Sequence, residues 1–115
     1  MSVKLIAELG SNPAPLWDVR RWCREAARAG AWGVKVQLFR AEHFPVFEQA
    51  EKRRLEFPRE RLADYVASAH HYGLSAGASV FDADAVALAG ELCDWLKTAA
   101  REQFNTELGH AVEAT

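Results

Sequence analysis

The sequence lacks the excess of basic residues that is typical of proteins that bind nucleic acid. Its 14 lysines and arginines stand against 16 aspartates and glutamates, which gives a formal net charge of -2 at pH 7. Nucleic-acid binding releases counterions through many basic side chains, and this chain has neither the excess nor a long basic run. We therefore expect no nucleic-acid partner.

A long apolar segment is also missing. The first residues, MSVKLIAELGS, contain an early lysine, a short apolar run and then a glutamate. This pattern fits neither a signal peptide nor a membrane span. We expect a cytoplasmic protein with no membrane partner.

Glycine, proline and cysteine are scarce. With 7 glycines and 4 prolines, and with half of its residues apolar, the chain has the composition of a folded domain. Cys23 and Cys93 are far apart and have no C-x-x-C spacing. Small buried side chains in a reducing compartment are therefore favoured over a disulfide or a zinc site.

What is present is a regular alternation of two hydrophobic periods. Four β-rich runs predict strands at 4–10, 33–39, 74–81 and 95–99. Apolar residues at helical spacing predict three helices between these strands. The order βαβαβαβ predicts a parallel sheet with right-handed crossovers.

Residues that end or cap helices support this order. Gly30 and Gly73 suit the left-handed ends of the first two helices, and Asp82 is a good N-cap for the third. Pro58 fits the first turn of the second helix. The segment from Arg40 to about Glu56 is predicted to be a charged loop region. For Glu48 to Glu60, which is rich in both charge signs, a solvated loop and helix start are favoured over a substrate lid.

Polar residues lie near the C-terminal ends of the predicted strands and alternate with apolar neighbours. They are Glu8, Lys35, Gln37, Ser79 and Lys97. Since a strand alternates its faces, all of them fall on the face opposite the apolar one. In (β/α) barrels this inner face collects the reactive groups, and two lysines with three polar neighbours would suit a small polyanion. The alternative is that these side chains simply face water.

The tryptophans fall on different predicted elements at spacings typical of a core. They are Trp17, Trp22, Trp32 and Trp95. Packing is favoured over a sugar-stacking platform.

Short motifs follow one another in a characteristic order. They are Ile6-Ala7-Glu8-Leu9-Gly10-Ser11-Asn12, Ala29-Gly30-Ala31, Val34-Lys35-Val36-Gln37-Leu38-Phe39, Ala41-Glu42, Tyr72-Gly73-Leu74, Ser79-Val80-Phe81-Asp82 and Asp94-Trp95-Leu96-Lys97-Thr98-Ala99. Together they resemble the first part of N-acetylneuraminate (sialic acid) synthase-like proteins, over residues 4 to about 106.

The resemblance implies an α/β fold. It would be a partial TIM-type (β/α) barrel with about four parallel strands and three helices, corresponding to the N-terminal half of the family's barrel domain. Residues 1–100 would form this domain, and residues 101–115 a polar C-terminal tail. A closed eight-stranded barrel needs more than twice this length.

The resemblance also implies an activity. The family condenses phosphoenolpyruvate with an amino sugar of the N-acetylmannosamine type to give a nonulosonic acid, with a divalent metal, manganese or magnesium. The matching positions are Glu8 for an active-site carboxylate, Lys35, Ser79 and Lys97 for phosphoenolpyruvate, and Glu102 for the amino sugar. Gln37 is a weaker candidate for the same site, and a structural role is equally favoured for it.

The chain departs from the family pattern in three places. Asn12-Pro13-Ala14-Pro15 lacks the family's histidine, and Ala100-Arg101-Glu102 lacks a hydroxyl and adds a bulky charge. The metal-binding histidines and the sugar-contacting domain belong to later segments that this sequence does not contain. Whether the chain is an enzyme is therefore left open.

Three alternatives follow. The chain could be a truncated synthase-like protein, with its site completed in a homodimer or by assembly with a missing half. It could be a catalytically inactive half-barrel that serves as a binding, assembly or regulatory module. A truncated gene product is the third alternative.

Overall fold

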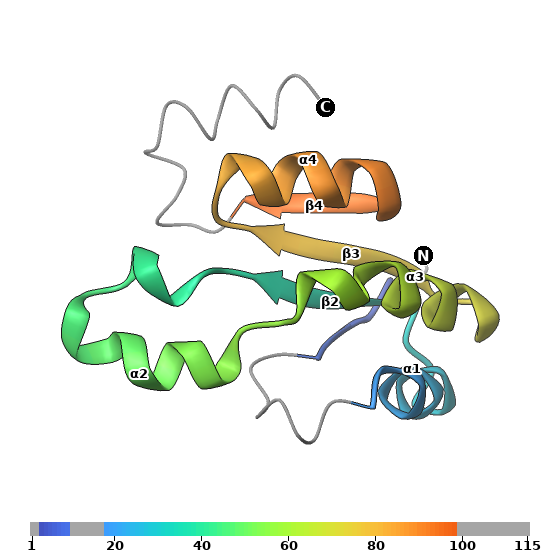
Figure 1. The fold of residues 1–115 in the computed structure, drawn as a ribbon. Helices are drawn as coiled ribbons and strands as arrows, with labels where there is room; N and C mark the ends of the chain where they lie inside the picture. Colours follow the sequence, from blue (N-terminus) through green and yellow to red (C-terminus); the bar gives the residue numbers. More distant parts are fainter. Residues whose placement is uncertain (1–2, 10–17, 99–115) are drawn as a thin grey trace.

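A parallel four-stranded sheet forms the centre of the fold (Figure 1). The structure is a computed structural model that describes residues 3–9 and 18–98. The strands are β1 (Ile6–Glu8), β2 (Gly33–Leu38), β3 (Ser75–Val80) and β4 (Trp95–Thr98). They lie in the order β1-β2-β3-β4, and every neighbouring pair is parallel. The predicted α/β fold with four parallel strands is therefore confirmed.

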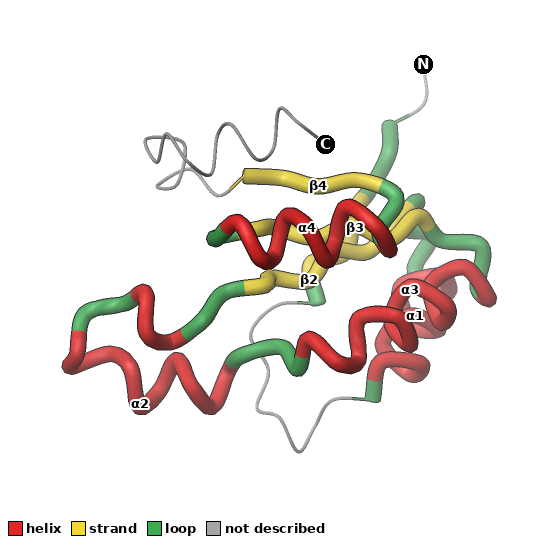
Figure 2. Tube along the Cα trace, turned by 45° about the horizontal axis from the view of Figure 1, so that its top comes forward, coloured by secondary structure: helices red, strands yellow, loops and turns green. Residues whose placement is uncertain are grey.

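Three helices connect successive strands, as the sequence predicts. They are α1 (Val19–Arg28), α3 (Leu62–His71) and α4 (Ala83–Leu92). These helices cover one face of the sheet, which we call the outer face (Figures 1 and 2). Gly30 and Gly73 have φ values of 86° and 75°, which confirms the predicted left-handed helix ends.

The core lies between the outer face and these helices. Its strand residues are Val34, Val36, Leu38, Ala76, Ala78 and Val80, all without exposed surface. The Tyr65 hydroxyl of α3 lies 3.0 Å from the carbonyl oxygen of Val34 and 2.7 Å from that of Gly77, and it donates to this pair. The buried tyrosine thus fixes α3 against both central strands.

A helix occupies the segment that the sequence predicts as a charged loop. This helix, α2 (Val46–Leu55), is followed by a 3-10 turn, η3 (Arg59–Arg61), and preceded by another, η2 (Ala41–His43). The loop prediction was wrong because α2 has no buried residue and hence no apolar stripe. Its residues are mostly strong helix formers, so intrinsic propensity is the signal that periodicity missed.

Both cysteines are free: Cys23 is buried and Cys93 is half-buried. Burial raises the pKa of each thiol to about 11, so both stay neutral near pH 7. Within the described residues, no helix is long and apolar enough to cross a membrane.

Candidate anion-binding site

The face of the sheet opposite the helices carries the polar residues that the sequence singles out. We call it the inner face. Strand register arranges its side chains in rows, because residues paired across parallel strands point to the same side. The lower row is Ile6, Gly33 and Ser75, the middle row is Glu8, Lys35, Gly77 and Trp95, and the upper row is Gln37, Ser79 and Lys97.

The register brings five of the six predicted site residues together. Gln37, Ser79 and Lys97 are direct neighbours across β2, β3 and β4 in the upper row, towards the C-terminal ends of the strands. Glu8 and Lys35 are neighbours in the middle row. Glu102 and the predicted tail, 101–115, lie outside the described residues.

The two lysines are not equivalent. Lys35 Nζ lies 2.9 Å from Glu8 Oε2, and the Lys35 side chain is only 18% exposed. Lys97 is exposed, and no ion pair holds it within the part of the chain that the structure describes. An incoming anion would therefore meet the full charge of Lys97 and a Lys35 charge that Glu8 partly neutralises.

Ser79 is the unusual member of the upper row. It is 4% exposed and is the one buried polar residue among those described. Within 3–9 and 18–98, no hydrogen bond is made by its hydroxyl. Buried hydroxyls usually have partners, so this group is poised to bond to a ligand or to water. The sequence pattern finds Ser79 but not its burial.

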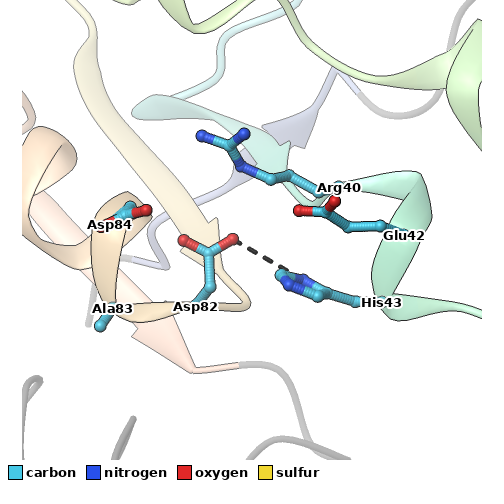
Figure 3. Close-up of a pocket in the computed structure, with 6 residues that line it drawn as sticks. All are labelled: Arg40, Glu42, His43, Asp82, Ala83 and Asp84. Atoms are coloured by element: carbon cyan, nitrogen blue, oxygen red, sulfur yellow. Dashed lines mark ion pairs between the residues drawn. The ribbon is translucent and has the colours of Figure 1, made fainter.

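A second polar cluster lies in the loops that follow β2 and β3. A pocket of about 250 Å³ is lined there by Arg40, Glu42, His43, Asp82, Ala83 and Asp84 (Figure 3). His43 Nδ1 lies 3.8 Å from Asp82 Oδ2, as the dashed line in Figure 3 shows. The sequence identifies Asp82 as a helix cap and as the end of a short motif, but not as part of this pocket.

Asp82 is engaged in structural contacts. Arg59 Nη2 donates to Asp82 Oδ2 at 2.8 Å and Nη1 donates to Oδ1 at 3.2 Å, while the backbone N–H of Ala85 donates to Oδ1 at 2.7 Å. Burial alone would raise the pKa of Asp82, but the hydrogen bonds from Arg59 and Ala85 outweigh it and the pKa is lowered. Asp82 thus confirms the predicted N-cap and joins α4 to η3. No sequence signal links Arg59 to Asp82, because 23 positions separate them.

The described residues do not fit a metal site. Across 3–9 and 18–98, no group of three or more histidine, cysteine, aspartate or glutamate side chains could hold an ion. The residues described here therefore do not supply ligands for the divalent metal that the sequence resemblance implies.

Comparison of the structure with solved structures gives three informative matches. N-acetylneuraminic acid (sialic acid) synthetase from Leptospira borgpetersenii serovar Hardjo-bovis, solved in complex with citrate, superposes with a TM-score of 0.85 and 25% identity, over 96% of this chain and 41% of that one. A truncated 3-deoxy-D-arabino-heptulosonate 7-phosphate synthase from Thermotoga maritima gives a TM-score of 0.70 and 14% identity, over 96% of this chain and 36% of that one.

A phospho-2-dehydro-3-deoxyheptonate aldolase (DAHP synthase), also from Thermotoga maritima, gives a TM-score of 0.67 and 14% identity over 94% of this chain and 30% of that one. The chain thus spans less than half the length of each of these three proteins. Models of protein families and curated protein sequences give no match. The two heptulosonate synthase matches show the fold alone. The chain has part of an N-acetylneuraminate synthase-like (β/α) barrel fold.

Proposed function

We propose that the inner face binds a small dianion of the phosphoenolpyruvate class, as part of the site of a sialic acid synthase-like protein. The carrying observation is the upper row, where the buried hydroxyl of Ser79 lies between Gln37 and the exposed ammonium of Lys97. A phosphate or carboxylate needs donors and positive charge already in place, and this row supplies both. The similarity to a sialic acid synthetase solved with citrate, a small polyanion, supports the proposal.

Each residue has a distinct part in this proposal. Lys97 supplies the charge, Ser79 donates from its hydroxyl, and Gln37 donates from its amide. Lys35 adds a weaker attraction because it is already paired with Glu8 at 2.9 Å. Glu8 would orient water or the reacting end of the sugar.

In the family's reaction the enol carbon attacks the aldehyde carbon, water adds to the resulting cation, and phosphate leaves. The amino sugar would be of the N-acetylmannosamine type, and Glu102 would contact it by analogy with the family. The described residues do not supply a site for the divalent metal, so none of them is assigned a role in binding it. Lys97, Ser79, Gln37 and Lys35 bind and orient the phosphoenolpyruvate end of the reaction.

Calorimetric titration of phosphoenolpyruvate into the purified chain tests the proposal. We expect saturable binding that Lys97→Ala weakens about 10-fold or more, because a hydrogen bond to a charged group contributes roughly 1.5–3 kcal/mol. Lys52→Ala is the matched control, since it removes a lysine on α2 that lies over the ring of Phe44. Absence of saturable binding by the unaltered chain would overturn the proposal.

The partner that completes the sheet is, in this proposal, a second copy of the chain. In the described sheet β1 and β4 are edge strands, with Glu8 on one edge and Lys97 on the other. A two-fold axis would place β1 of one copy against β4 of the other, and closure is the usual way to remove exposed edges. Light scattering at micromolar concentration should then give twice the chain's mass of 12.8 kDa; a monomer would contradict it.

An inactive assembly module is the second candidate. The two edge strands of the described sheet favour it independently of the anion site. It predicts a dimer that does not bind phosphoenolpyruvate. The calorimetric and light-scattering measurements together therefore distinguish the two candidates.

A further inference from the structure

Trp95 is packed flat against a glycine on the inner face. It is half-buried at the start of β4, and its register partner on β3 is Gly77. A Cβ atom added to Gly77 would overlap three carbons of the indole ring, so the ring lies directly on the backbone of β3. Trp95 Nε1 also donates a hydrogen bond to Ser75 Oγ at 3.1 Å. Contact with β3 therefore fixes the position of the ring, and the hydrogen bond to Ser75 fixes its orientation.

This ring fills the part of the middle row that the other residues leave open. Glu8 and Lys35 span β1 and β2 through their ion pair at 2.9 Å. The indole of Trp95 covers β3, where Gly77 and Ser75 are small enough to admit it. Pairing a large residue with small ones in this way is how layers of side chains interdigitate. The middle row is thus occupied across the width of the sheet.

The upper row lies one step nearer the C-terminal ends of the strands. Ser79 is two residues after Gly77, and Lys97 is two residues after Trp95, on the same face. A ligand held by the upper row would therefore rest on the indole. A flat apolar surface beneath the row also excludes water from one side, which strengthens the interactions of the hydroxyl and ammonium groups with an anion.

We propose that Trp95, held in place by Gly77, is the floor of the anion site. It is a positioning residue that keeps a small dianion in the upper row, beside Ser79 and Lys97. It blocks movement of the dianion into the middle row, where Glu8 and Lys35 form their ion pair. This inference rests on the proposed anion site. The sequence favours a packing role for Trp95, and the structure places this packing on the inner face, against Gly77, and not in the core beneath the helices.

Three variants test the floor in phosphoenolpyruvate titrations followed by calorimetry and tryptophan fluorescence. Gly77→Ala pushes the ring away without changing any charge, and Trp95→Ala removes it. Both should weaken binding about 10-fold. Trp95→Phe keeps a flat ring and should bind within about 3-fold of the unaltered chain. The fluorescence change on binding should be smaller in Trp95→Phe than in the unaltered chain, because only Trp17, Trp22 and Trp32 remain to report it.

The outcomes distinguish failure of the proposal for Trp95 from failure of the proposed anion site. If the unaltered chain binds and Lys97→Ala does not, the site stands; a fluorescence change as large in Trp95→Phe as in the unaltered chain would then overturn the floor alone. The same holds if Trp95→Ala binds as tightly as the unaltered chain. If the unaltered chain does not bind, both proposals fail. Trp95→Phe keeps the test decisive even where Gly77→Ala does not fold.

Discussion

The two faces of the same sheet differ in burial and in the side chains that they carry, and β2 shows this most clearly. Its outer-face residues Val34, Val36 and Leu38 are completely buried beneath helices. Its inner-face residues Lys35 and Gln37 are half-buried and polar. Alternation along one strand therefore provides a core on one side and a set of charged and hydrogen-bonding groups on the other. One strand of six residues thus contributes to the core and to the polar inner face.

The largest expected contrast comes from removing an outer-face side chain. Leu38→Ala should lower the free energy of unfolding by about 3 kcal/mol, because it leaves a cavity in a site with no exposed surface. Lys97→Ala, on the inner face, should change it by less than about 0.5 kcal/mol. Urea denaturation measures both values. Equal losses would show that the two faces are not specialised as described.

The next effect concerns the loops at the C-terminal ends of β2 and β3. Asp82→Ala should cost about 2 kcal/mol, since it removes the N-cap of α4 and leaves the 16% exposed Arg59 side chain without its carboxylate. Thermal unfolding checks this, with Asp84→Ala as a control on the same helix turn. A loss no larger than that of the control would mean that the Asp82–Arg59 pair does not stabilise the fold.

The smallest expected effect is the change that Asp82 makes to the pH dependence of the free energy of unfolding at acidic pH. The pKa of Asp82 is lower in the folded chain than the roughly 3.9 of an unfolded aspartate. Its contribution is therefore present above that value and is lost as pH falls through the folded pKa. Asp82→Asn should make unfolding less dependent on pH below about 4. A pH profile unchanged from that of the unaltered chain would contradict this assignment.

Much of the fold could be predicted because it follows from local patterns. Period-two alternation located β2 and β3 to within a residue or so, and Gly30, Gly73 and Asp82 marked helix ends through their backbone and capping preferences. Helix α2 was not predicted because none of its residues is buried, and hydrophobic periodicity detects only helices with a buried face.

The site was predicted less completely, for a different reason. Alternation placed Lys35 and Lys97 on the same face, but it could not show that Glu8 neutralises one of them and not the other. Nor could it show that the ring of Trp95 lies on Gly77. These features depend on register between strands that are far apart in the sequence, and alternation along each strand does not by itself reveal which residues become neighbours.

One paired measurement tests the separation of the two faces most directly. Lys97→Ala and Val36→Ala are each examined by urea denaturation and by phosphoenolpyruvate titration in the same buffer. We predict that Lys97→Ala keeps its stability and loses binding about 10-fold, whereas Val36→Ala loses about 2 kcal/mol and keeps its affinity. A Lys97→Ala variant that binds normally but unfolds as readily as Val36→Ala would contradict the account.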